Sequence, residues 1–192
     1  DRDTRSYSRH AMAGAGRDER AWVRGAQAGS VSDFEALFRA HWPRAYRAAY
    51  LVVHDAGAAE DLAQEAFLAA VRTLDRFDSG RPFGPWLHRI VVNRAIDWVR
   101  ARALRREVGA GEAIEHFAGE ERQSTAAPLP ADVVAGLASL SPEHRAVVVL
   151  RYVLEYTPGE IARILELPRG TVNSRLRRGL DTLQDAVGPR EE

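Results

Sequence analysis

Apolar residues recur at helical spacing along much of the chain, and the clearest pattern lies over residues 157–187. Its first part reads T-P-G-E-I-A-R-I-L-E-L, in which Thr157 and Glu160 have the spacing of a capping box. The helix must stop before Pro168, because a residue that precedes proline is disfavoured in helical geometry. A short helix, a turn near Leu167 and a second helix are therefore predicted.

The second helix has an apolar stripe at steps of three or four residues, formed by Val172, Leu176, Leu180, Leu183 and Val187. Residues 169–178 carry four Arg and no acid. Polar and guanidinium groups at the leading end of such a helix suit the bases and phosphates of a DNA major groove. The expected DNA contacts are Arg169, Thr171, Asn173, Ser174, Arg175, Arg177 and Arg178. The plain alternative is a solvated basic helix face.

Two further helical patterns come earlier in the chain. Ser32 and Glu35 are expected to form a capping box, and Pro43 to begin a second helical phase that ends in a turn over 54–57. The following helix reads A-E-D-L-A-Q-E-A-F-L-A-A-V, with an inward side of Leu62, Ala66, Phe67, Ala70, Val71 and Leu74. Its other side exposes Glu60, Asp61, Gln64 and Glu65. Without a nearby His, this acidic side is expected to be solvated, not a metal or acid–base site.

A loop marked by Gly80, Pro82, Gly84 and Pro85 precedes a basic helix. This helix is predicted to start at Pro85 and to bury Leu87, Ile90, Val91, Ile96 and Val99. Residues 81–106 contain seven Arg and a single acid, Asp97. Aromatic rings beside guanidinium groups suit single-stranded nucleic acid, because rings stack on bases and guanidinium groups bind phosphates. For Trp86, packing in the core is the alternative.

The pattern breaks over residues 107–130, where five Glu face one Arg and apolar periodicity is missing. This stretch is predicted to be a flexible acidic linker, and the polar residues 1–25 a flexible arm. Helical signals resume at Ala131, and Ser141 suits the cap of the next helix. The predicted fold is all-α: two small helical domains, 26–106 and 131–188, of which the second is a helix-turn-helix.

Composition narrows the function further. The 27 Arg balance 27 acids and there is no Lys, so an indiscriminate nucleic-acid binder is disfavoured. The absence of Cys excludes disulfides and thiolate metal sites. The six His lack ligand spacing, and neither a phosphate-binding loop nor a catalytic triad occurs, so no cofactor, metal or catalytic residue is expected. Neither a membrane-length apolar run nor a signal-peptide pattern is present, which predicts a cytoplasmic protein.

Three strings resemble bacterial RNA polymerase sigma factors of the extracytoplasmic-function (ECF) class. They are E-I-A followed by P-R-G-T-V-N-S-R-L-R-R-G, then A-E-D-L-A-Q-E-A-F-L, and F-x-x-W-L-x-x-I-x-x-N-x-x-x-D-x-x-R. The resemblance covers residues 31–187 and implies that 131–188 reads the minus 35 promoter element. It also implies that 26–106 melts and reads the minus 10 element, through Arg76, Arg81, Phe83, Trp86, Arg89, Asn93, Arg94, Asp97 and Arg100.

The same resemblance implies the partners. Glu60, Asp61, Gln64 and Glu65 would dock on the clamp coiled coil of the largest core polymerase subunit, and the second domain on the flap of the second-largest. Promoter DNA and an anti-sigma factor are the other implied partners, with no enzymatic activity and no membrane contact of the chain's own. The acidic linker would thread the RNA exit channel, or serve only as a tether. The alternatives are a helix-turn-helix regulator that acts without polymerase and a nucleic-acid enzyme.

Overall fold

The computed structural model describes residues 19–107 and 129–187, and every regular element within these ranges is helical, as predicted. Residues 19–27 are helical. The elements that follow are α2 (Val31–Val53), α3 (Ala56–Thr73), the 3₁₀ turn η1 (Leu74–Arg76), α4 (Phe83–Glu107), α5 (Ala131–Ser139), α6 (Pro142–Val148), the π-helical turn η2 (Val149–Val153), α7 (Pro158–Ile164) and α8 (Arg169–Val187). The predicted linker falls largely on residues 108–128, outside the described ranges.

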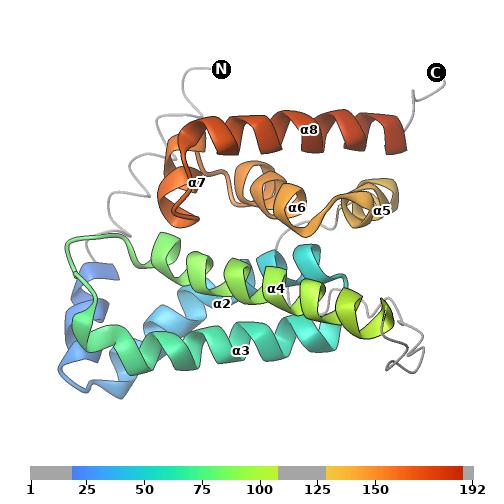
Figure 1. Cartoon of the computed structure of the whole chain (residues 1–192). Helices are drawn as coiled ribbons and strands as arrows, with labels where there is room; N and C mark the ends of the chain where they lie inside the picture. Colours follow the sequence, from blue (N-terminus) through green and yellow to red (C-terminus); the bar gives the residue numbers. More distant parts are fainter. Residues whose placement is uncertain (1–18, 108–128, 188–192) are drawn as a thin grey trace.

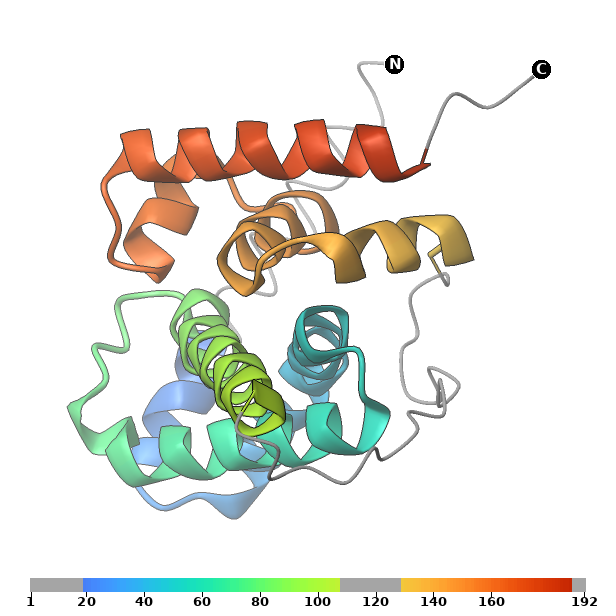
Figure 2. The same ribbon diagram turned by 45° about the vertical axis from the view of Figure 1, so that its right-hand side comes forward.

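The helices form two bundles stacked on each other (Figures 1 and 2). Helices α2, α3 and α4 make the lower bundle, and α5, α6 and α7 lie beneath α8 in the upper one. Helix α4 contacts α2 and α3 on one side and α6 and α7 on the other. Helix α4 is therefore part of the lower bundle and also contacts the upper one.

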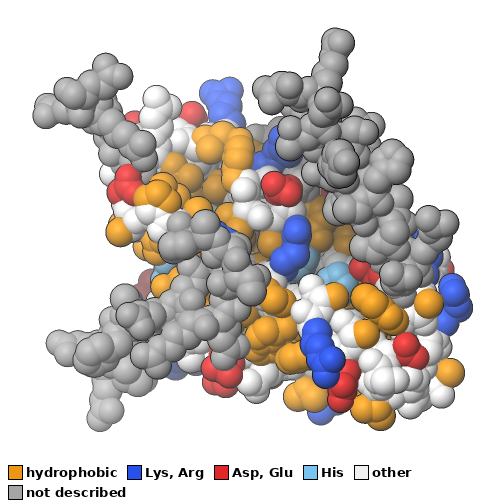
Figure 3. Space-filling model, turned by 180° about the vertical axis from the view of Figure 1, so that it is seen from behind, with side chains coloured by type: hydrophobic (Ala, Val, Ile, Leu, Met, Phe, Trp, Pro, Cys, Tyr) orange, Lys and Arg blue, Asp and Glu red, His pale blue; other side chains and the backbone are white. Residues whose placement is uncertain are grey.

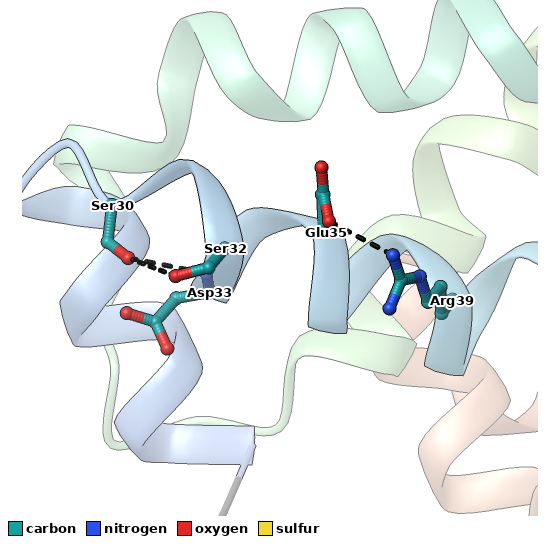
Figure 4. Close-up of polar contacts among 5 residues, drawn as sticks. All are labelled: Ser30, Ser32, Asp33, Glu35 and Arg39. Carbon is teal, nitrogen blue, oxygen red and sulfur yellow. Dashed lines mark hydrogen bonds and ion pairs between the residues drawn. The ribbon is translucent and has the colours of Figure 1, made fainter.

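The start of α2 differs from the prediction by two residues (Figure 4). Ser30 is the N-cap, and its hydroxyl accepts a hydrogen bond from the Asp33 amide at 3.3 Å. Ser32 already lies in the first turn, where its hydroxyl is 3.1 Å from that of Ser30. Glu35 pairs with Arg39 at 3.1 Å instead of closing a capping box. The predicted Ser32 cap is therefore wrong.

Pro43 lies inside the continuous helix α2, so the predicted second helical phase is wrong. A proline in a helix interior costs about 3 kcal/mol through its missing donor and a clash with the preceding turn. Leu37 before it and Ala45 after it are both fully buried, which offsets this cost. The helix ends as predicted at a turn, where His54 has a left-handed backbone with φ of 54° and Asp55 caps α3.

The arm predicted over residues 1–25 is partly helical. Residues 1–18 lie outside the described ranges, whereas 19–25 belong to the first helix. Val23 is 1% exposed, and Trp22 and Ala26 pack against the core. These three apolar residues share one helix face. A helix this short becomes stable only when that face packs on the lower bundle.

Apolar stripes on the other helices also shift from their predicted positions. Val71 and Leu180 are 46% and 39% exposed, although both were expected inside. On α8 the inward position falls on Gly179, where a β-carbon would lie 2.9 Å from Val148 Cγ2. A glycine there lets α8 approach α6 closely. Helix α4 starts at Phe83, two residues before the predicted start at Pro85.

One buried cation joins the two bundles. Arg145 of α6 is 6% exposed and donates to the carbonyl oxygens of Val52, Ala138 and Leu140, the last two at 2.7 and 2.9 Å. The final carbonyls of a helix lack partners within it, so the guanidinium serves as a cap for α2 from the other bundle. Burial lowers the pKa of Arg145 to about 10, which leaves it charged at neutral pH.

A histidine and a tyrosine form a second polar contact across the bundles. His88 Nδ1 lies 2.8 Å from the Tyr156 hydroxyl, and His88 is 1% exposed. Burial, together with the charges of His41 and Arg44, lowers the pKa of His88 to about 3. Arg44 also donates to the Leu154 carbonyl at 2.7 Å. The folded state therefore holds His88 neutral.

The pKa of His88 predicts acid sensitivity. Its neutral form is favoured by folding, so this contribution to stability is complete above pH 6.5 and is lost as the pH falls from 6.5 towards 3. Between pH 8 and pH 5 the parent should lose about 2 kcal/mol more unfolding free energy than His88→Gln. Urea unfolding at a series of pH values measures this difference. His144→Gln, on the first turn of α6, is the control and should follow the parent; equal pH profiles for all three proteins would exclude the effect.

Candidate nucleic-acid and polymerase interfaces

Helices α7 and α8 form the predicted helix-turn-helix. Thr157 Oγ1 accepts from the Glu160 amide at 3.3 Å, and Glu160 Oε2 accepts from the Thr157 amide at 2.8 Å, which confirms the capping box. Hydrogen bonds from the Thr157 side chain and backbone lower the pKa of Glu160. The chain turns over residues 165–168 and enters α8 at Arg169. The cap and the turn thus fix where α8 begins.

The predicted duplex-contacting residues share the outer side of α8. Five are exposed and two are half-buried; the exposed ones are Arg169, Asn173, Ser174, Arg177 and Arg178, and the half-buried ones Thr171 and Arg175. On the inner side, Val172 and Leu176 are 0% and 8% exposed. Arg177 lies 3.9 Å from Asp181 one turn later, a weak exposed pair. The outer side is therefore available to a partner.

Seven of the nine predicted minus 10 residues line a single groove, here called the α4 groove. These seven are Arg76, Arg81, Trp86, Arg89, Asn93, Arg94 and Asp97. The Trp86 ring is half-buried and stacks on Phe77, with ring centroids 4.5 Å apart. The groove therefore combines an aromatic wall with several guanidinium groups, the combination that binds single strands.

The other two predicted minus 10 residues lie elsewhere. Phe83 is fully buried, and its ring packs against His41, Phe77 and Trp86 at 5.2 to 6.0 Å. A direct contact between Phe83 and DNA is therefore wrong for this conformation. Arg100 forms an ion pair with Glu143 of α6 at 2.5 Å, away from the groove. Burial raises the pKa of Glu143, but hydrogen bonds from its own backbone and from Arg100 outweigh this effect. The pKa of Glu143 is therefore below its ordinary value.

The far wall of the α4 groove comes from the upper bundle and was not foreseen. Glu160, Arg163, Ile164 and Glu166 line it, and Glu166 Oε1 lies 2.5 Å from Arg89 Nη1. Glu166 has a left-handed backbone with φ of 53°, which costs a residue with a side chain about 1 kcal/mol. The Glu166 carboxylate thus pairs with Arg89, a residue that was predicted to bind phosphate. The two residues are far apart in sequence, so no local pattern signals this pair.

The acidic side of α3 is exposed at Asp61, Gln64 and Glu65, and half-buried at Glu60. Gln64 donates to Glu60 at 3.3 Å, while Glu65 forms an ion pair with Arg94 at 2.8 Å. This pair joins the predicted polymerase-binding side to the α4 groove.

Two apolar side chains extend the acidic side of α3. Leu68 and Val71 are 56% and 46% exposed; helical spacing puts Leu68 next to Gln64 and Glu65, and Val71 next to Leu68. Exposed apolar residues beside charges are typical of protein interfaces. The sequence pattern missed Val71 because the stripe on α3 assigns it to the interior, and it gave Leu68 no role.

Neither a metal site nor a membrane span emerges from the described ranges. They contain no group of three His, Cys, Asp or Glu residues placed to hold a metal, and no helix long and apolar enough to cross a membrane. Figure 3 shows the face opposite to that of Figure 1, where Arg side chains are dispersed among hydrophobic and uncharged groups wherever described atoms are visible. The basic groups are thus local features and do not form one broad patch on this face.

Comparison with known proteins identifies both bundles. Residues 37–105 match Sigma-70 region 2, and residues 132–183 match Sigma-70 region 4. Among solved structures, CnrH in complex with the cytosolic domain of CnrY is 27% identical with a TM-score of 0.66, covering 88% of this chain and 96% of that one. RpoE from Bartonella quintana in complex with the anti-sigma factor NepR is 24% identical with a TM-score of 0.65, covering 84% and 100%, and shows the fold alone.

Two curated relatives extend the match along the chain. The ECF RNA polymerase sigma factor SigE of Mycolicibacterium smegmatis is 37% identical over 160 residues, which cover 81% of this chain but 62% of SigE. The ECF RNA polymerase sigma factor SigW of Bacillus subtilis is 32% identical over 170 residues, which cover 81% of this chain and 89% of SigW. With both sigma regions present in order, this chain belongs to the ECF RNA polymerase sigma factors.

Proposed function

We propose that this protein binds core RNA polymerase and directs it to specific promoters, where it helps to separate the DNA strands. The observation that carries the proposal is the gathering of seven predicted minus 10 residues in the α4 groove. The chain supplies binding and strand capture, whereas polymerase forms the phosphodiester bonds. Because bacterial transcription takes place in the cytoplasm, the protein acts there.

The two DNA-binding surfaces divide the work. The outer side of α8 reads the minus 35 element as duplex, because a helix with short polar and guanidinium groups fits the major groove. The α4 groove holds the unpaired minus 10 strand, with Trp86 beside the bases and Arg89 and Arg94 at phosphates. Both guanidinium groups carry carboxylate partners here, Glu166 and Glu65. A phosphate entering the groove replaces those partners.

The acidic side of α3 docks on the clamp coiled coil of the largest polymerase subunit, and the upper bundle on the flap of the second-largest. Exposed carboxylates at Asp61 and Glu65 suit a basic partner, and Leu68 adds apolar contact area. A helix-turn-helix regulator that acts without polymerase is not favoured, because it has no use for this side of α3 or for the α4 groove.

An anti-sigma factor is proposed as the protein that restrains this chain. CnrH is solved with the cytosolic domain of CnrY, and RpoE with the anti-sigma factor NepR, and both resemble this chain over most of its length. The likeness to CnrH, at 27% identity, supports a partner protein for this chain, which we propose to be an anti-sigma factor.

Asp61→Arg tests core binding and the function together. The parent protein with purified core enzyme should start transcripts at defined promoter positions, and Asp61→Arg should lose core affinity at least about tenfold through charge repulsion. Asp61 is the sharper choice, because reversing Glu65 would also disturb Arg94. Co-purification with core and in vitro transcription are the measurements. Glu35→Arg reverses an exposed charge on α2 and breaks only an exposed pair with Arg39, so it should behave like the parent. Undiminished core binding by Asp61→Arg would contradict the docking side.

Replacing Arg177 or Arg178 by Ala should weaken binding of the full chain to minus 35 duplex by about 1–3 kcal/mol for each residue that contacts a base. Both side chains are exposed, so the fold should be unchanged. Fluorescence anisotropy with promoter duplex gives the affinity. Arg39→Ala, 79% exposed on α2, is the matched loss of one positive charge and should leave affinity intact. Parent-like affinity after both replacements would rule out this side of α8.

Glu166→Gly should open the α4 groove. The change removes the carboxylate at Arg89 and relieves the left-handed backbone, so single-strand affinity of the free protein should rise about fivefold without loss of stability. Glu155→Gly is the matched control: φ there is 62°, and Glu155 forms no ion pair within the described part of the chain. Titration with a labelled single-stranded minus 10 oligonucleotide measures the affinity of each variant. Equal affinities for the two variants would show that Glu166 does not restrict the groove.

A further inference from the structure

The helix over residues 19–27 holds both ends of the loop that borders the α4 groove. Gln27 Nε2 donates to the carbonyl oxygens of Leu74 at 2.9 Å and Phe77 at 2.7 Å, where the loop begins. Glu19 Oε1 accepts from the Phe83 amide at 2.7 Å, where the loop ends and α4 starts. Two side chains of one short helix thus fix the entry and the exit of residues 77–83.

Each of these contacts satisfies a backbone group that needs a partner. The first amides of a helix have no acceptor within it, and a carboxylate near them also interacts favourably with the helix dipole. Burial raises the pKa of Glu19, but hydrogen bonds from His41 and from the Phe83 amide lower it below the ordinary value. Its second oxygen lies 3.0 Å from His41 Nε2. Glu19 is therefore an ionised cap of α4 that belongs to a distant helix.

The loop between these anchors shapes the groove. Arg81 lies on it, and Phe77 at its start stacks on Trp86 to form the aromatic wall. A shift of the loop would therefore move Arg81 and the Phe77 ring relative to Trp86 and to the Arg and Asn side chains of α4. Glu19 and Gln27 are not among the residues that line the groove.

We propose that Glu19 and Gln27 are positioning residues for capture of the melted strand, a role that rests on the proposed function. They hold the loop in the geometry that keeps Arg81 and the Phe77 ring beside Trp86 of α4, where one strand would bind. The helix lies before residue 37, where the match to Sigma-70 region 2 begins. Val23, 1% exposed, anchors the helix in the core. The backbone that carries Glu19 and Gln27 is therefore held in place.

The test uses the full chain carrying Glu19→Ala and Gln27→Ala together, assembled with core polymerase on promoter DNA. Loss of these hydrogen bonds should reduce permanganate reactivity of the melted thymines about tenfold. Affinity for core and for minus 35 duplex should stay within about twofold, because the hydrogen-bond partners of Glu19 and Gln27 lie on neither of the two proposed surfaces. Amides of residues 77–83 should exchange with deuterium about tenfold faster in the free protein, since the anchored loop then opens more easily.

Ser30→Ala is the matched control, because it removes the stabilising α2 cap in the same bundle and leaves the loop anchors intact. It should melt the promoter like the parent, while Asn93→Ala, in the groove itself, should not. Unchanged deuterium exchange or normal melting in the double variant overturns the positioning role. Equal melting defects in Ser30→Ala also overturn it, since lost stability would then explain the result. A parent holoenzyme that fails to initiate would instead refute the proposed function. Deuterium exchange of the free protein would still show whether Glu19 and Gln27 hold the loop over residues 77–83.

Discussion

Burial of α4 on two sides is the constraint on which the rest of this structure depends. Phe83, Leu87 and Val91 are fully buried, and α4 contacts α2 and α3 as well as α6 and α7. Two packed sides leave only a narrow strip for polar groups, and Arg89 and Asn93 follow each other along it by one turn. The residues proposed to bind the single strand therefore lie along one side of α4, with its buried core residues behind them.

Several polar contacts cross the joint between the two bundles. Arg145, His88 and the Arg89–Glu166 pair all cross it. Polar groups regain hydrogen bonds from water when such a joint opens, so separation costs less than for an apolar interface of equal area. Under the proposed function, the chain reaches two promoter elements at once, which requires bundles that can separate. Two Arg side chains of the α4 groove, Arg89 and Arg94, have carboxylate partners in this structure.

The sequence by itself determined the features that depend on neighbours along the chain. The capping box of Thr157 and Glu160 was predictable because the bonds span three residues. Exposure of Asp61 and of the outer side of α8 followed from helical periodicity, which separates apolar from polar faces. The order of the helices, the helix-turn-helix and the family resemblance could be predicted for the same reason, because each depends on short segments of the sequence.

Tertiary structure alone decided which partner covers each face. Periodicity gave Leu180 an inward place, but close approach of α6 to Gly179 turned it outward. Phe83 was expected at DNA, yet the rings around it in the core bury it completely. The helix at residues 19–27 lacks a strong pattern of its own and forms because the lower bundle receives Val23. These outcomes depend on contacts between residues far apart in sequence, whose energies no local spacing contains.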